Sequence, residues 1–298
     1  MEISKAYKKK ALLLRVLLGF FIVSTIVCAV LIGIELNTIR QGREYYSTLT
    51  DDVEKNPRQD IYEPPDTLSP EPTVTPTAGA TSGPAHTGGE EYVWVPYVDF
   101  GELNQRFRGT TAAWIFLRDT VIDYPVMQAR DNDYFLRRLP DGSSHRNGSI
   151  FLDYRCSPDF TDKNTLIYGH NMRSGDMFGV LKEYHSQSFY QQHPVVYIYT
   201  ADRDYAVVLF AGYILDSAFE VPPLRFRDEG AFTAYIADVT RRSVFRSEVE
   251  VSADDRIVCL ATCDSTNSSN RNLRLIIVGK LVDLGPFDSP AIPSISPE

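Results

Sequence analysis

The most apolar stretch of the chain lies close to its N-terminus. The segment from Val16 to Ile34 contains no charged side chain. As a helix, a run of this length can cross a hydrocarbon core of roughly 30 Å. A cleaved signal peptide is the alternative, but its apolar region is typically only about 7–15 residues long, and Ile34-Glu35-Leu36-Asn37 is a poor cleavage site. We therefore expect a transmembrane anchor over residues 11–36.

A second change of pattern separates this anchor from the rest of the chain. Asn37 to Gln59 is polar and predicts either a helical extension or a frayed stalk. Prolines and threonines dominate between Pro64 and Pro84, and such a stretch cannot bury a core. We expect residues 37–91 to form an extracellular stalk and linker that holds the next domain away from the lipid. A globular domain over 92–284 and a C-terminal tail over 285–298 would follow.

The pattern of the globular part indicates short strands broken by turns. It is rich in β-branched and aromatic residues and punctuated by Gly, Pro, Asn and Asp. Eight strands are expected: Ala113–Leu117, Val121–Val126, Ser149–Leu152, Thr165–Tyr168, Val195–Tyr199, Tyr205–Leu215, Arg256–Ala261 and Leu275–Val282. Helical spacing predicts helices at Asp99–Phe107, Phe178–Tyr184 and Glu229–Ser243. Many strands and few helices predict a mainly β fold, a closed or nearly closed barrel.

Charge sets the orientation of the anchor and limits the partners. The basic residues of the N-terminal end all precede the apolar run: Lys5, Lys8, Lys9, Lys10 and Arg15. Positively charged flanks stay in the cytoplasm, so residues 1–10 are expected inside the cell and the globular domain outside. The whole chain has a formal net charge of −9, and its outer part is more acidic still. That acidity argues against nucleic acid as a partner.

Cysteine usage favours a reactive thiol over a disulfide framework. Of four cysteines, Cys28 lies in the apolar span, which leaves Cys156, Cys259 and Cys263 outside. Disulfide-stabilised domains use cysteine more densely and usually in even number. On one extended strand, Cys259 and Cys263 would be ~13 Å apart, beyond disulfide reach. An exported thiol therefore invites a nucleophile hypothesis, although burial as a small apolar residue is the default for Cys156 and Cys259.

Cys263 is the best placed of these thiols. It ends the apolar run from Ile257 to Thr262 and opens into the polar loop Asp264–Asn272. The next expected strand follows Arg274, so antiparallel pairing around the loop would bring Cys263 and Arg274 together. A guanidinium there could donate hydrogen bonds to an oxyanion and favour the thiolate.

A thiol nucleophile also needs an acid/base partner, and the chain has five histidines. His86 lies in the spacer and His145 in a polar turn. His185 and His193 flank a helix end and a strand start, where a solvated role is expected. His170 differs, because it follows an expected strand and a glycine, a position that matches the placement of Cys263. On spacing alone, a structural role for His170 stays open.

These residues resemble the signature of the sortases, cysteine transpeptidases of Gram-positive bacteria. The segment Cys259-Leu260-Ala261-Thr262-Cys263, followed by Arg274, is similar to Thr-Leu-X-Thr-Cys…Arg, with Cys259 in place of Thr. Five further segments resemble class B sortases: Ile122-Asp123-Tyr124-Pro125-Val126, Asp131-Asn132, Gly148-Ser149-Ile150-Phe151-Leu152-Asp153-Tyr154, Tyr168-Gly169-His170-Asn171-Met172 and Met177-Phe178-Gly179. The long helix expected before the cysteine strand also fits class B.

The resemblance implies an eight-stranded sortase barrel and a thioacyl mechanism. In it, Cys263 attacks the Thr carbonyl in the C-terminal sorting motif of an exported protein, and His170 protonates the leaving amine. Arg274 positions the substrate and stabilises the oxyanion. An amine of a peptidoglycan precursor or a pilin then resolves the intermediate. Three residues are further candidates for substrate binding: Thr262, Asn171 and Leu260. No cofactor is implied, and neither a paired-cysteine metal motif nor a Gly-rich phosphate loop occurs in the sequence.

Two alternatives remain open at this point. An extracellular cysteine peptidase would use the same residues but would mainly hydrolyse, even with abundant amine present. An inactive barrel that serves as a surface-binding or pilus-scaffold module is the non-enzymatic alternative. The simultaneous presence of Cys263, His170 and Arg274 argues against decay of the site.

Overall fold

The computed structural model describes residues 2–53, 55, 92–94, 97–263, 272–285 and 288–290; side chains are described for 15–53, 55, 97–262 and 272–285. The chain divides into two compact units, Met1–Leu49 and Thr50–Glu298. The first unit consists of helix and the second contains the barrel.

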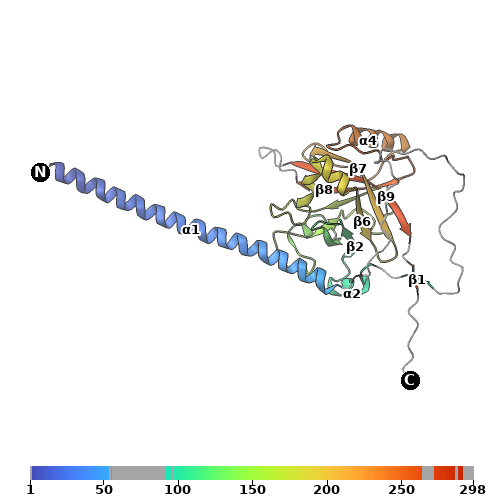
Figure 1. Ribbon diagram of the computed structural model, residues 1–298, viewed down its shortest axis with the longest axis horizontal. Helices are drawn as coiled ribbons and strands as arrows, with labels where there is room; N and C mark the ends of the chain where they lie inside the picture. The colour runs from blue at the N-terminus through green and yellow to red at the C-terminus, as the bar shows by residue number, and fades with distance from the viewer. Residues whose placement is uncertain are drawn as a thin grey trace, which may run out of the picture. The chain divides into compact units, whose positions relative to one another are not determined.

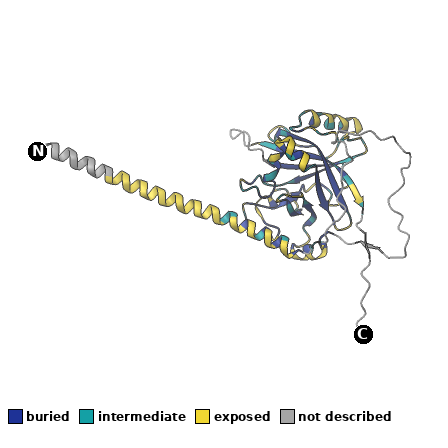
Figure 2. Ribbon diagram, viewed as in Figure 1, coloured by how far each residue is buried: buried dark blue, intermediate teal, exposed yellow. Residues whose placement is uncertain are grey.

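A single helix, α1 (Glu2–Asp52), forms the N-terminal part of the chain. From Arg15 onward it is long and apolar enough to cross a membrane. Its apolar side chains are exposed, as Figure 2 shows, and Phe21 is 74% exposed. Such a surface is stable only against lipid or another apolar environment. Of the two expectations for the polar residues after 37, the helical extension is confirmed as far as Asp52.

Eight strands close into a barrel in the order β2-β3-β4-β5-β8-β9-β7-β6 (Figure 1). They are β2 (Thr111–Phe116), β3 (Asp123–Met127), β4 (Ile150–Leu152), β5 (Asn164–Tyr168), β6 (Val195–Tyr199), β7 (Asp204–Asp216), β8 (Arg256–Cys263) and β9 (Leu273–Gly285). Each corresponds to an expected strand, with ends that coincide or differ by at most three residues. The closed eight-stranded barrel is confirmed. A separate antiparallel pair joins β1 (Tyr92–Trp94) to β10 (Asp288–Pro290).

Short helices cover the barrel. They are α2 (Phe100–Arg106), the 3₁₀ turns η1 (Phe135–Arg137) and η2 (Gly179–His185), α3 (Gln187–Gln192) and α4 (Glu229–Arg241). The longest, α4, packs on β7 and buries Phe232 and Val239. Asp228 caps it by accepting a hydrogen bond from the Ala231 amide at 2.8 Å. The sequence pattern missed η1 and α3 because neither is long enough to show a helical repeat.

The compact unit that contains the barrel also includes residues that precede the expected spacer. Lys55 pairs with Val98 in an isolated antiparallel bridge, and its Nζ lies 2.5 Å from Oδ2 of Asp123. The same carboxylate accepts a hydrogen bond from Nε1 of Trp114 at 2.6 Å. The expected spacer, Pro64 to Pro84, lies outside the described residues. Lys55 therefore belongs to the compact unit that contains the barrel, which begins at Thr50. The domain boundary expected at residue 92 stays a prediction.

The contacts of Lys55 with Val98 and Asp123 predict how the free energy of unfolding responds to a substitution at Lys55 and to a deletion within the expected spacer. Lys55→Met should lower the free energy of unfolding by about 1–2 kcal/mol, because it removes a charged hydrogen bond that is only about one-fifth exposed. Deleting residues 64–84 should change it by less than about 1 kcal/mol, since halving a loop alters closure entropy by only ~0.6 kcal/mol. Urea unfolding of the full chain in detergent, followed by tryptophan fluorescence, measures both.

Lys182→Met is the matched control, because Lys182 approaches Glu183 only to 4.0 Å and is 42% exposed. It should leave stability unchanged within about 0.5 kcal/mol. Equal effects of Lys55→Met and Lys182→Met would show that the contacts of Lys55 do not stabilise the barrel unit.

Candidate active site

The pairing of β8 with β9 places Cys263 beside Arg274. In this antiparallel ladder the two residues are direct partners, and such partners have Cα atoms about 4.5–5.5 Å apart. The expectation that both residues lie at the same end of adjacent strands is therefore confirmed. For Cys263 the structure describes the backbone.

His170 lies at the same strand end as Cys263, on the opposite edge of β8 from Arg274. There β5 runs parallel to β8, with Tyr168 paired to Ala261. The Gly169 amide continues this ladder by donating to the Ala261 carbonyl at 3.1 Å. His170 follows Tyr168 by two residues, as Cys263 follows Ala261. Since adjacent strands are about 4.8 Å apart, the backbone brings Cys263, Arg274 and His170 together at one end of three neighbouring strands.

The imidazole of His170 is oriented by a backbone carbonyl. Its Nε2 lies 2.6 Å from the carbonyl oxygen of Leu136 in η1. A carbonyl can only accept, so Nε2 carries the proton and Nδ1 is left to exchange protons. Burial lowers the pKa of His170, and the nearby charges of Arg137 and Arg146 lower it further, against the raising effect of the Leu136 hydrogen bond. The free enzyme therefore holds His170 mainly neutral at pH 7.

The backbone around His170 is closely packed. The Phe178 amide donates to the His170 carbonyl at 3.0 Å. A Cβ on Gly169 would lie 2.6 Å from both Ile150 Cδ1 and the Phe178 ring, so only glycine fits at this position. Gly148 has a φ of +58°, and a Cβ there would lie 2.6 Å from the Leu136 carbonyl oxygen. Two glycines thus set the backbone on both sides of the histidine hydrogen bond.

The connection between β7 and β8 begins next to Arg274. Leu215 of β7 pairs with Arg274, whose side chain is half-buried and whose Nη1 donates to the Leu273 carbonyl at 2.9 Å. Ser217 binds the Asn272 carbonyl through its amide at 2.9 Å and its hydroxyl at 2.8 Å. Two residues further on, Phe219 is 90% exposed. An exposed aromatic side chain therefore follows the strand position that pairs with Arg274 by four residues.

The three secondary candidates lie differently. Asn171 is half-buried and adjoins His170, with its backbone in a bridge to Met177. Thr262 is 2% exposed, and its hydroxyl has no hydrogen-bond partner among the described residues. Leu260 is 0% exposed because its strand is covered on both faces. Leu260 is therefore part of the core, and its expected role in substrate binding stays a prediction.

The other two thiols of the barrel unit are buried, as expected. Burial raises the pKa of Cys156 to about 11 and that of Cys259 to about 12. Cys259 is enclosed under α4, where its Sγ lies 3.7 Å from the Tyr235 hydroxyl. Thiols with such pKa values are poor nucleophiles at neutral pH. Packing is therefore the role of Cys259 at the position where the signature has Thr.

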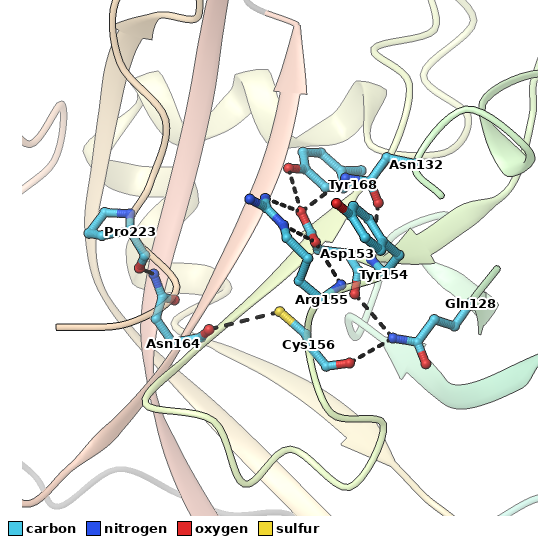
Figure 3. A network of polar contacts seen from close by, with 9 residues as sticks. All are labelled: Gln128, Asn132, Asp153, Tyr154, Arg155, Cys156, Asn164, Tyr168 and Pro223. Carbon is cyan, nitrogen blue, oxygen red and sulfur yellow. Dashed lines mark hydrogen bonds and ion pairs between the residues drawn. The ribbon is translucent and has the colours of Figure 1, made fainter. Parts of the chain in front are cut away.

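Sequence reasoning missed a polar network next to this site, which Figure 3 shows. Its centre is Asp153, which is 0% exposed and follows β4 directly. Arg155, Asn132 and Tyr168 donate hydrogen bonds to its carboxylate. Asp153, Asn132 and Tyr168 all lie in segments that resemble class B sortases, but nothing in the sequence indicates that these side chains contact one another.

The comparisons with known proteins agree with this geometry. The family model for the sortase domain matches residues 117–282. Sortase B of Listeria monocytogenes is 40% identical over 184 residues, covering 62% of this chain and 73% of that protein. Sortase B of Staphylococcus aureus is 29% identical over 193 residues, covering 65% of this chain and 77% of that protein.

Solved structures show the same likeness. A Staphylococcus aureus sortase B–substrate complex has a TM-score of 0.58 and 29% identity, covering 62% of this chain and 85% of that one. The structure of sortase B from Listeria monocytogenes has a TM-score of 0.54 and 38% identity, covering 60% and 98%. The chain belongs to the sortase family of cysteine transpeptidases, and within it to the class B sortases.

Proposed function

We propose that this chain cleaves a C-terminal sorting motif of exported proteins and joins the new acyl end to a cell-wall or pilin amine. The observation that carries the proposal is the convergence of Cys263, Arg274 and His170 at the ends of β8, β9 and β5. A thiol, a guanidinium and an imidazole are the groups that acyl transfer through a thioester requires. Membership of the sortase family supports the same reaction.

In the first half-reaction, Nδ1 of neutral His170 takes the thiol proton of Cys263, and the resulting thiolate attacks the Thr carbonyl of the sorting motif and forms a C–S bond. The carbonyl π electrons move to oxygen, and the guanidinium of Arg274 stabilises the negative charge by hydrogen bonding. The intermediate collapses by breaking the C–N bond. The leaving amine takes a proton from His170, and a thioacyl-enzyme remains.

In the second half-reaction, an amine from a peptidoglycan precursor or a pilin attacks the thioester. It forms a new C–N bond and loses a proton to His170, and the C–S bond breaks to restore the thiolate. The thioester conserves the energy of the cleaved amide, so a well-placed amine can compete with water. Nδ1 is the nitrogen that carries out both proton transfers, because Nε2 donates to Leu136.

The reaction would take place at the outer face of a membrane. The exposed apolar surface of α1 supports an anchor, and the basic tail supports a cytoplasmic N-terminus with the barrel outside. Substrate specificity would reside in the connection between β7 and β8. Phe219 and Val221 there are 90% and 55% exposed next to the strand pair that holds Arg274, and they offer apolar contacts to a peptide.

Substitution of the three site residues should separate their roles. Cys263→Ala should abolish cleavage of a sorting-motif peptide and the thioacyl adduct seen by intact mass spectrometry. His170→Gln should form little adduct, since the leaving amine has no acid. Arg274→Ala should lower kcat/KM by roughly 10²–10³-fold, and Arg274→Lys should recover only part because it lacks the planar fork.

Cys156→Ala is the matched control and should keep activity within about threefold, because that thiol is buried and its raised pKa of about 11 makes it a poor nucleophile. The peptide is incubated with and without triglycine or diaminopimelate, and products are identified by mass. Transfer to the amine supports the proposal. Hydrolysis that added amine never diverts would identify a peptidase instead, and full activity in Cys263→Ala would exclude thiol catalysis.

The state of His170 predicts a pH effect on both titration and stability. Because burial lowers its pKa, the NMR titration midpoint of His170 should fall below the ordinary value of about 6.5. The unfolded chain then binds this proton first as pH falls. The contribution of His170 to stability is present above about pH 6.5 and is lost as pH drops through the lower folded-state pKa.

The His170→Gln variant identifies the NMR signal of His170, since it removes one of the five histidine resonances. The stability of wild type relative to His170→Gln should decline on acidification in urea titrations at a series of pH values. A midpoint at or above 6.5 would contradict the burial of this imidazole.

A further inference from the structure

We propose that Asp153 is the positioning residue of the active site, because it holds both the strand end that carries His170 and the loop whose carbonyl orients the imidazole. The inference rests on the acid/base role proposed for His170. Asp153 itself touches neither His170 nor the reacting atoms in the described contacts. It acts through the residues that bind its carboxylate.

Five hydrogen bonds converge on this carboxylate (Figure 3). Oδ1 accepts from the amide and Nε of Arg155, at 3.0 and 2.9 Å. Oδ2 accepts from Nη2 of Arg155 at 2.8 Å, Nδ2 of Asn132 at 3.0 Å and the hydroxyl of Tyr168 at 3.1 Å. A carboxylate that is 0% exposed needs such partners to remain charged.

The charged state is consistent with these partners. Burial acts to raise the pKa of Asp153, but the hydrogen bonds from Arg155 and Asn132 outweigh it and hold the pKa below its ordinary value. Acceptance of five donors also requires both oxygens to be free of protons. Asp153 is therefore a fixed anion, suited to holding donors in place rather than to titrating during turnover.

One arm of the network fixes the strand of His170. Tyr168 closes β5, and its ring stacks on Phe151 of β4 at 5.2 Å. The bond to Asp153 adds a polar tie at the end of this side chain. His170 comes two residues later. The hydrogen bond from the Tyr168 hydroxyl to Asp153 therefore fixes the last residue of β5 before the imidazole.

The other arm fixes the acceptor of His170. Asn132 bridges two points, because its Nδ2 donates to Asp153 and its Oδ1 accepts from the Tyr154 amide at 3.0 Å. Next to it, Oδ1 of Asp131 accepts hydrogen bonds from the amides of residues 133 and 134 at 2.9 and 2.8 Å, in the turn that leads into η1. Leu136 in η1 supplies the carbonyl that binds Nε2. The Asp153 carboxylate thus connects the segment that carries the donor, His170, with the segment that carries the acceptor, Leu136.

This arrangement explains why a residue outside the reaction would matter to its rate. The Leu136 carbonyl selects the Nε2–H form of neutral His170 and thereby keeps Nδ1 as the proton-exchanging atom. Loosening either arm lets the imidazole turn and lets both neutral tautomers form. Misplacement by about 1 Å can lower a rate roughly 10²-fold.

The test is Asp153→Asn in the full chain in detergent. It keeps the side-chain shape but replaces one acceptor oxygen by an NH₂ group that faces donors. Long-range ¹H–¹⁵N NMR should show His170 change from the Nε2–H tautomer to a mixture. The kcat for peptide transfer should fall roughly 10–100-fold, with KM for the sorting peptide changed less than about threefold.

Asp283→Asn is the matched control. It also removes an aspartate–arginine hydrogen bond, to Arg203 at 2.6 Å, but in the part of β9 remote from Arg274 in the strand. Tautomer and kcat should stay as in wild type. Tyr168→Phe keeps the ring stack and removes only one bond, so it should lie between wild type and Asp153→Asn. If Asp153→Asn is unfolded by circular dichroism, Tyr168→Phe and Asn132→Ala carry the same test.

Retention of the Nε2–H tautomer in Asp153→Asn or, where that variant is unfolded, in both single-arm variants would overturn the proposal. A rise of KM at unchanged kcat would overturn it too, because it would make the network a substrate contact. The tautomer is read without turnover. A wild-type chain with ordered His170 but no amine transfer would therefore refute the proposed function and leave this inference standing.

Discussion

The site depends on the two different pairings of β8. On one edge the strand runs parallel to β5, and on the other it runs antiparallel to β9. The register of each ladder decides which residue lies beside Cys263. Val258 and Leu260, both 0% exposed, fix that register through core packing. A slip of one residue would turn every side chain of β8 to the opposite face, so the energy of the core also determines the geometry of the chemistry.

Polar interactions then orient the side chains of the site on the backbone that strand pairing has positioned. Strand pairing places backbones to within the spacing of a sheet, but a proton transfer needs one nitrogen of one tautomer to face its partner. In this protein a carbonyl in a 3₁₀ turn makes that choice, and a buried anion holds the turn and the strand together. The two glycines at 148 and 169 allow the backbones to approach closely enough for this to occur.

Much of the barrel was predictable from the sequence because its signals are local. Alternating and β-branched runs locate all eight strands, and antiparallel pairing of the strands that flank the polar segment Asp264–Asn272 implies that Cys263 and Arg274 meet. The approach of His170 was inferred from its strand-end position. In contrast, the Leu136 carbonyl is 34 residues from His170 in the sequence, and Lys55 is 68 residues from Asp123. A backbone acceptor has no residue-type signature, and an isolated ion pair has no period, so only the folded structure reveals them.

The bridge between Lys55 and Val98 has a consequence for how such chains can diverge. A bridge that joins the two ends of a segment makes the length of that segment free to vary, because additions between the ends move neither of them. Proline- and threonine-rich sequence can accumulate there, or a binding module can be inserted, without a change in the strand ladders that carry Cys263. Relatives of this protein are therefore expected to differ most in length between these two positions, while the barrel that follows keeps its spacing.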